Sequence, residues 1–236
     1  SWFATTERYD GLVMRPDFPS GKCQIGKFIY YNTWTGWAVE PCEKGDCDLF
    51  LDFIMECVCD SNADYYNWVL DYYADLIQNP ARKHSKIFTL RGVPGSGKNT
   101  LTETMIHLMG DKYAIMIDSD VLSNHFNSLL YGKIYIVADE AIWSGDRGVW
   151  NDLKRLTGGT KLTIESKGKD KFVADNFIRL NITTNEKYAA PKEVGDRRYE
   201  IFTTSARHVG DDGYWDAIHE QLKNGGYEKL MYILMN

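Results

Sequence analysis

The sequence lacks the long apolar runs and the leader pattern that direct a chain into or across a membrane. No run approaches the roughly 18 uncharged residues that a membrane-spanning helix needs. The first residues, SWFATTERYD, have neither a basic end nor an apolar core, so they do not resemble a secretory signal. We therefore expect a soluble chain without a membrane partner, compatible with a piece cut from a longer polypeptide.

Cysteine pairs of the kind that hold zinc or build a disulfide framework are also missing. The cysteines are odd in number and form no C-x-x-C pair; they are Cys23, Cys42, Cys47, Cys57 and Cys59. We expect reduced, packed thiols rather than disulfides or structural zinc. A reducing cytoplasm fits this usage best.

Basic residues are in the minority, since the formal net charge of the 236 residues is −6. An acidic chain does not attract nucleic acid as a whole, so any such binding needs a local basic patch. The remaining composition, with 44% hydrophobic and 25% charged residues, is that of a globular protein with one large domain, or one domain with a small appendage.

The chain divides into three segments by its patterns. In residues 1–80, short strands and turns come first, with a hairpin predicted around Thr35 and Gly36. Two helices then follow between about 47 and 78, with Asp64 as a plausible cap of the second and Asn79-Pro80 as its end. Residues 81–210 alternate strands with helices, which indicates a mostly parallel sheet covered on both faces. Residues 211–236 read as two short helices hinged at Gly225-Gly226.

The stretch RGVPGSGKNT, residues 91–100, has the form of a phosphate-binding loop between a predicted strand and a predicted helix. Glycines let backbone amides point at a phosphate, and the lysine adds a positive charge. Asn99 stands where the usual pattern has Ser or Thr. The alternative is a Gly/Pro-rich turn that binds nothing. The predicted nucleotide-binding residues are Gly92, Pro94, Gly95, Ser96, Gly97, Lys98, Asn99 and Thr100.

Polar residues at two strand ends complete the predicted site. Asp139 and Glu140 end the buried run IYIVADE, where Asp139 can hold Mg²⁺ and Glu140 can activate a water molecule. Asn185 ends a neighbouring strand, LNITTN, and can contact the γ-phosphate or the water. Because parallel strands share one rim at their carboxyl ends, these side chains should converge with Lys98.

Taken together, these motifs resemble the superfamily 3 helicases of the AAA+ class, and more closely the helicase part of bacteriophage and prophage primase–helicase and primase-polymerase proteins. The segments that carry the resemblance occur in the family's order: NTWTGWAVEP, PGSGKNTL, HFNSLLYGK, VADEAIWSGD, LTIESKGKD, LNITTNE and GDRRYEIF. Phosphate loops of this family resemble GKN followed by Ser or Thr, so Asn99 followed by Thr100 resembles the family's form of the loop. Either Asn99 or Thr100 is then the metal ligand beside Asp139.

The resemblance implies an α/β P-loop ATPase of AAA+ type, with a small helical region before it and short helices after it. It also implies a hexameric ring that hydrolyses ATP with Mg²⁺ between subunits and travels 3′ to 5′ on single-stranded DNA. Arg197 and Arg198 can then reach a neighbour's γ-phosphate, where the alternative is a solvated salt bridge. The helices at 47–78 are either an oligomerising collar or ordinary core helices, and a primase or polymerase domain can precede Ser1.

The family's DNA contact is implied to lie on a hairpin before the Asn185 strand, which here is ESKGKDK. From Arg147 to Lys171 seven residues are basic and three acidic, a local balance of 7 − 3 = +4. A basic hairpin suits a phosphate backbone, although lysine-rich turns are common on soluble proteins. The predicted DNA contacts are Lys167, Lys169 and Lys171.

Three other functions remain open on these residues. The first is an ATPase of the same fold that loads or remodels a replication complex without unwinding DNA. The second is a small-molecule kinase, although the acid pair with a downstream Asn and paired Arg favours water as the acceptor. The third is a degenerate module that binds through the basic hairpin and hydrolyses nothing.

Overall fold

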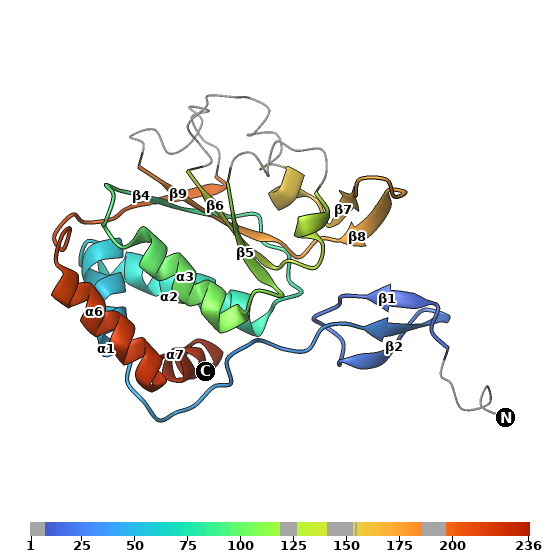
Figure 1. Cartoon of the computed structure of the whole chain (residues 1–236), viewed down its shortest axis with the longest axis horizontal. Coiled ribbons are helices and arrows are strands. Elements are labelled where there is room, and N and C mark those ends of the chain that lie inside the picture. Colours follow the sequence, from blue (N-terminus) through green and yellow to red (C-terminus); the bar gives the residue numbers. More distant parts are fainter. Residues whose placement is uncertain (1–7, 119–126, 141–152, 154, 186–196) are drawn as a thin grey trace. The chain divides into compact units, whose positions relative to one another are not determined.

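The computed structural model describes residues 8–118, 127–140, 153, 155–185 and 197–236. By its internal contacts the chain forms two compact units, Ser1–Gly36 and Trp37–Asn236 (Figure 1). Each unit has its own sheet. None of the helices within the described residues combines the length and the apolar character needed to cross a membrane.

The first unit is a three-stranded sheet with the order β1-β3-β2, in which β1 (Gly11–Val13) is parallel and β2 (Gly21–Ile25) antiparallel to β3 (Phe28–Asn32). The β2–β3 hairpin turns at Gly26, whose φ of +62° suits a tight turn. The predicted hairpin around Thr35 and Gly36 is therefore wrong. Gly36 also has a positive φ, but the residues on either side of it form no strands that could pair.

The second unit begins with the two predicted helices. α1 (Asp48–Phe53) continues into a π-helical turn (Ile54–Val58), and α2 (Ala63–Gln78) follows. The cap of α2 is Asn62 rather than the predicted Asp64, because the Asn62 side chain accepts from the backbone N–H groups of Asp64 and Tyr65. Asn79 ends the helix before Pro80, as predicted.

Five parallel strands form the central sheet of this unit. They are β4 (Ile87–Arg91), β5 (Ala114–Ile117), β6 (Tyr135–Asp139), β9 (Arg179–Thr184) and β10 (Tyr199–Thr203). Their order in the sheet is β10-β4-β9-β6-β5. The predicted α/β fold with a central, mostly parallel sheet is confirmed. Because β9 lies between β4 and β6, the segments that follow these three strands emerge side by side.

Both faces of the sheet are covered, as the buried strands predict. On one face, Phe88 of β4 packs against Trp68, Tyr72 and Tyr73 of α2, and α3 (Lys98–Met109) lies beside α2 (Figure 1). A second apolar cluster covers the other face. It contains every second residue of the strands, such as Ile136 and Leu180, and also Leu130 of the 3-10 turn Ser128–Leu130. Since α2 buries its apolar stripe on the sheet, ordinary core packing explains that stripe.

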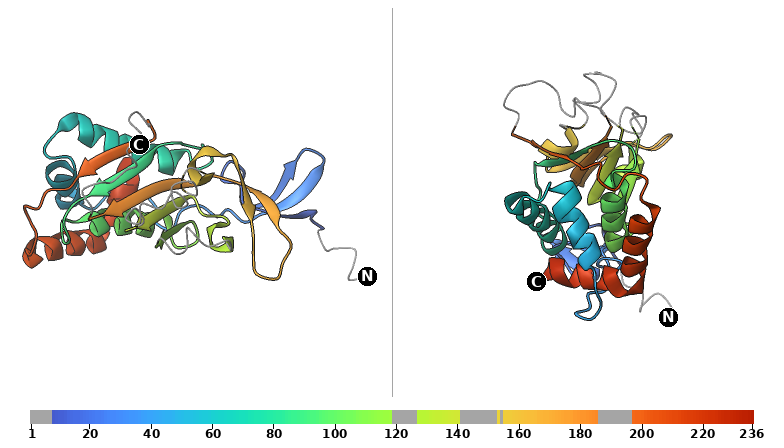
Figure 2. Two further views of the ribbon diagram at one scale, coloured as in Figure 1. Left: turned by 90° about the horizontal axis from the view of Figure 1, so that it is seen from above. Right: turned by 90° about the vertical axis from the view of Figure 1, so that its left-hand side faces the viewer.

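The carboxyl-terminal helices lie on the same side of the sheet as α1, α2 and α3 (Figure 2). α6 (Asp212–Gln221) and α7 (Tyr227–Met235) are joined through a π-helical turn (Leu222–Gly226). Its kink falls at Asn224 and at Gly225, which has a φ of +96°. A hinge is therefore present, one residue before the predicted Gly225-Gly226 pair, because Gly226 is already helical. Residues 155–158 form a further helical turn.

Candidate functional site

The loop between β4 and α3 needs glycine at two positions. Gly97 has a φ of +86°, a left-handed value that favours glycine, and a Cβ atom there would lie 2.5 Å from the ring of Phe53. A Cβ atom on Gly92 would lie 1.9 Å from the hydroxyl oxygen of Thr204. The backbone of this loop is therefore held tightly by the surrounding fold.

Ser96 fixes the loop on the side that faces β10. Its buried hydroxyl oxygen lies 2.7 Å from the Val93 carbonyl oxygen and 2.7 Å from the hydroxyl oxygen of Thr204, the residue that follows β10. Gly92 packs against the same threonine. Of the predicted nucleotide-binding residues, Gly92 and Ser96 thus lie behind the loop and do not line the cavity in front of it.

Lys98 begins α3, and its ammonium group is surrounded by oxygen atoms. Nζ donates to the carbonyl oxygens of Gly92 at 2.8 Å and Val93 at 3.0 Å, and to Asn185 Oδ1 at 2.7 Å. The lysine is only 6% exposed. Burial lowers the pKa of Lys98, and the neighbouring Glu140 carboxylate opposes this shift. The site therefore places a positive charge directly beside the glycine loop.

Two carboxylates stand at the end of β6. Asp139 accepts a hydrogen bond from the Thr183 hydroxyl of β9, and the backbone N–H of Glu140 donates to the Thr183 carbonyl oxygen at 3.0 Å. Glu140 has a φ of +49°, an uncommon left-handed value for a residue with a side chain. Such outliers persist where the fold enforces them and are concentrated at functional sites. The turn directs the exposed Glu140 side chain towards the end of β9.

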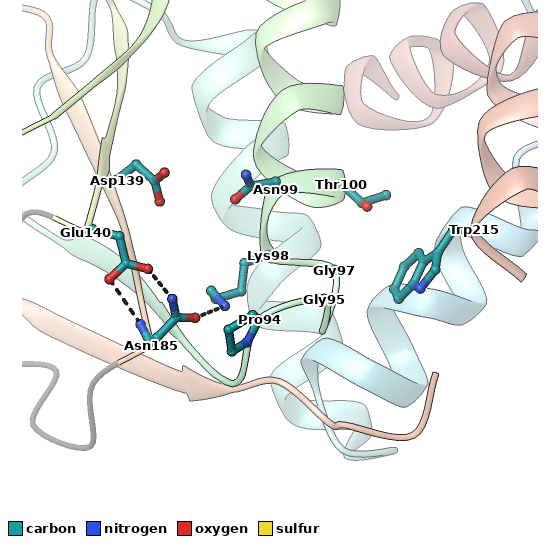
Figure 3. Close-up of a pocket in the computed structure, with 10 residues that line it drawn as sticks. All are labelled: Pro94, Gly95, Gly97, Lys98, Asn99, Thr100, Asp139, Glu140, Asn185 and Trp215. Carbon is teal, nitrogen blue, oxygen red and sulfur yellow. Dashed lines mark hydrogen bonds between the residues drawn. The ribbon is translucent and has the colours of Figure 1, made fainter. Parts of the chain in front are cut away.

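Asn185 connects the lysine to the glutamate. Its Oδ1 accepts from Lys98, while its Nδ2 donates to Glu140 Oε1 at 2.5 Å (Figure 3). This orientation of the carboxamide is the only one that satisfies both neighbours, because the ammonium only donates and the carboxylate only accepts. The predicted convergence of these residues is therefore seen in the fold, with Asn185 at its centre.

A cavity of about 370 Å³ opens in front of the loop. In Figure 3 the carboxamide of Asn99 lies on the side of Asp139, whereas the Thr100 side chain lies on the opposite side, towards Trp215. Carboxylate and amide oxygens are the hard ligands that Mg²⁺ takes, so Asp139 and Asn99 fit such an ion. The lining residues are Pro94, Gly95, Gly97, Lys98, Asn99, Thr100, Asp139, Glu140, Asn185 and Trp215.

The paired arginines lie at the amino ends of the strands, opposite the cavity. Arg197 and Arg198 precede β10, whose first residue pairs with Ile87 at the start of β4, and the Ile87 N–H donates to the Arg198 carbonyl oxygen at 2.7 Å. Lys98 follows the far end of β4, and a five-residue strand is about 16 Å long. Within one chain these arginines therefore do not join the cavity.

The lysine-rich segment forms the expected hairpin. β7 (Lys161–Ile164) and β8 (Phe172–Asp175) pair antiparallel, and the three predicted DNA contacts, Lys167, Lys169 and Lys171, are exposed in and beside their connection. Lys171 forms an ion pair of 2.7 Å with Glu165. Two cations of the counted basic stretch, Arg147 and Lys154, lie outside the described residues.

Two residues of this site are absent from the sequence-based prediction. Thr204 carries no motif of its own and is recognised only by its contacts with the loop. Trp215 lies in an amphipathic helix far along the chain, where a tryptophan is usually part of the core. Nothing in the sequence distinguishes it from such a residue.

Comparison with known proteins gives a family match over part of the chain and a set of similar folds. Residues 90–198 match a family of unknown function, DUF5906. No curated protein matches the chain. The apo structure of the NrS-1 C-terminal region (305–718) has 20% identity and a TM-score of 0.80, over 96% of this chain and 55% of that one.

Two A-form apo structures of the same NrS-1 region agree with this result. One has 20% identity and a TM-score of 0.78, covering 95% of this chain and 54% of that one. The other has 21% identity and a TM-score of 0.80, covering 96% and 54%. The chain thus spans little more than half the length of these structures. Over that length it has the same fold.

Proposed function

We propose that this chain is the ATP-dependent DNA helicase or translocase domain of a phage-type replication protein, acting as a hexameric ring on single-stranded DNA. One observation carries the proposal. Lys98, Asp139, Glu140 and Asn185 come from three different segments and meet at one cavity in front of a glycine loop. A triphosphate-hydrolysing site needs this combination of a cation, metal-binding oxygens and a base.

Each residue has a role that follows from its position. Lys98 binds the terminal phosphates. The phosphate oxygens compete for its ammonium group with the two loop carbonyl oxygens to which it donates. Asp139 and Asn99, rather than Thr100, hold Mg²⁺, which would neutralise charge on the phosphate oxygens. Glu140 accepts the proton of the attacking water. Asn185 keeps Glu140 at a defined position beside Lys98.

The motor function rests on two groups of basic residues outside the cavity. Lys167 and Lys169 stand at the connection of the β7–β8 hairpin, where they can follow a phosphate backbone. Arg197 and Arg198 lie too far from their own cavity to serve it, so they act on the nucleotide of a neighbouring subunit. A ring in which the arginines of each subunit complete the next subunit's pocket accounts for the arginines and leaves the hairpin lysines to bind DNA.

The hydrolytic site is tested with two variants. Lys98→Ala should abolish nucleotide binding, because it removes the phosphate-binding charge. Glu140→Gln keeps the shape of the side chain and should retain binding of ATP while hydrolysis falls by about 10²- to 10⁴-fold. Phosphate release and binding of a non-hydrolysable analogue measure the two effects. Wild-type turnover in both variants would show that the site is elsewhere.

The hairpin is tested with a charge-matched pair of variants. Lys167→Ala with Lys169→Ala should keep basal hydrolysis, weaken stimulation by single-stranded DNA and reduce the salt dependence of DNA binding. Lys44→Ala with Lys223→Ala removes the same charge from exposed sites at the helical end and should change none of these. A strand-displacement assay then separates unwinding from remodelling, since a remodeller hydrolyses ATP without displacing a strand.

A further inference from the structure

The cavity in front of the glycine loop has two chemically different ends. Asp139, Glu140 and Asn185 occupy one end, and Trp215 of α6 occupies the other, with Lys98 and the loop between them (Figure 3). The proposed function accounts for the polar end only. A nucleoside triphosphate whose terminal phosphates lie at Lys98 has to place its sugar and base in the rest of the cavity.

Trp215 is held in place by one hydrogen bond and two aromatic contacts. Its indole Nε1 donates to the His208 carbonyl oxygen at 2.9 Å. The ring of Phe53 packs against it edge to face, with centroids 5.5 Å apart, and the ring of Tyr214 does so at 5.0 Å. The indole is half-buried and is positioned before any ligand binds.

The helix that carries Trp215 begins at a fixed point. Asp211 caps α6 by accepting from the backbone N–H of Tyr214 at 3.1 Å, and the His208 ring stacks on Tyr214 with centroids 3.7 Å apart. A Cβ atom on Gly97 would lie 2.6 Å from the edge of the Trp215 ring, so the indole touches the glycine loop directly. The aromatic surface and the phosphate loop thus form one continuous wall.

We infer that Trp215 is the base-binding platform of the nucleotide site, and that the site recognises its nucleotide mainly through the phosphates. An aromatic ring stacks on any base, because every base has a π-face. The one hydrogen-bond donor of the indole is already used by His208, so Trp215 cannot select among bases. The four common nucleoside triphosphates should therefore bind with affinities within about tenfold of one another.

This inference rests on the proposed function, and inorganic tripolyphosphate separates the two. Tripolyphosphate with Mg²⁺ contacts the loop and Lys98 but has no base. Trp215→Leu should weaken binding of a non-hydrolysable ATP analogue by about tenfold or more, the size of one lost base–aromatic contact. The affinity for tripolyphosphate should stay unchanged. Trp215→Phe keeps an aromatic face and should recover most of the loss.

Titration calorimetry of the wild type and both variants gives these affinities, and denaturant unfolding confirms that the variants fold. Equal losses for the ATP analogue and tripolyphosphate in Trp215→Leu would mean that the indole only supports the loop, which overturns the inference. Unchanged affinity for the analogue would also overturn it, as would strong preference of the wild type for one base. Failure of tripolyphosphate to bind the wild type would overturn the phosphate site itself, and the base platform with it.

Discussion

Two buried asparagines near β9 should respond to the same substitution with opposite sign. Asn181 lies in the middle of β9, beside Phe88 of β4 and Val137 of β6, and is 0% exposed. Within the described part of the chain, neither its Oδ1 nor its Nδ2 has a hydrogen-bond partner. A buried polar group left without a partner costs about 1–3 kcal/mol. Asn181 therefore destabilises the strand it occupies.

Asn176, five residues earlier, is also buried but has every polar atom engaged. Its Nδ2 donates to the carbonyl oxygens of Leu156 at 2.9 Å and Gly159 at 2.8 Å. Its Oδ1 accepts from the Ile178 N–H at 3.0 Å and from Lys83 Nζ at 3.2 Å. This side chain ties the segment before β9 to the helical turn at 155–158.

Leucine has the same branching as asparagine and no polar atoms, so it isolates the hydrogen-bonding term. At 181 it removes two unsatisfied groups and adds some volume, and we expect the free energy of unfolding to rise by about 2 kcal/mol. At 176 it breaks four hydrogen bonds, including those to the Gly159 carbonyl oxygen and the Ile178 N–H, and we expect a fall of about 4 kcal/mol. In a chain of this size the melting temperature should shift by roughly 2–4 °C per kcal/mol.

Denaturant titration followed by circular dichroism measures both changes, with the slope of the transition as a check that the unfolded state is unaffected. A loss of stability in Asn181→Leu as large as that in Asn176→Leu would refute the reasoning, because it would mean that Asn181 has partners after all. Stabilisation accompanied by slower ATP hydrolysis would indicate that the unsatisfied group is retained for function.

Three further predictions concern single residues. Because burial lowers the pKa of Lys98 from 10.5, affinity for an ATP analogue should fall as pH rises through the lowered value. Over the same range the free energy of unfolding of the ligand-free protein should rise with pH, since its folded state binds fewer protons than the unfolded chain. A Lys98→Met variant should show neither pH dependence, as measured by calorimetry and by denaturant unfolding at several pH values. Asn185→Asp replaces the donor to Glu140 with a second carboxylate and should lower kcat for phosphate release by about 10²- to 10³-fold, and an unchanged kcat would contradict the bridging role. With a colorimetric thiol reagent, the native protein should react quickly at Cys42 alone, because the other four cysteines are buried; rapid reaction of a second thiol would contradict that packing.

The polar end of the site could be predicted from the sequence because one rule of topology generates it. Carboxyl ends of parallel strands meet at one rim, so a glycine loop after one strand, two acids after another and an asparagine after a third have to converge. Neither the strand order nor the side-chain pairing was needed for that conclusion. The strand order then explains why Asn185, rather than either acid, is the direct neighbour of Lys98: β9 lies between β4 and β6.

The aromatic end could not be predicted in this way. Trp215 reaches the cavity because α6 packs against α1 and the loop. The order of motifs along the chain does not predict that packing. The two local errors have a similar origin. Asn62 and Asp64 are both good helix caps, and Gly26 and Gly36 both favour turns, so composition alone does not choose between them. The contacts of each segment make the choice.

Strand β10 joins the parts of the site that lie in different pockets of the proposed ring. Arg197 and Arg198 precede its amino end, at the opposite end of the strand from their own cavity. The residue after its carboxyl end, Thr204, bonds to Ser96 in the glycine loop. β10 is the edge strand, held on one side only by β4 within the described sheet. In the proposed ring, a shift of this strand would move the arginines beside a neighbour's nucleotide together with the loop of its own cavity. In the proposed ring this would couple neighbouring nucleotide sites, through the Ser96–Thr204 hydroxyl pair and through the pairing of β10 with β4.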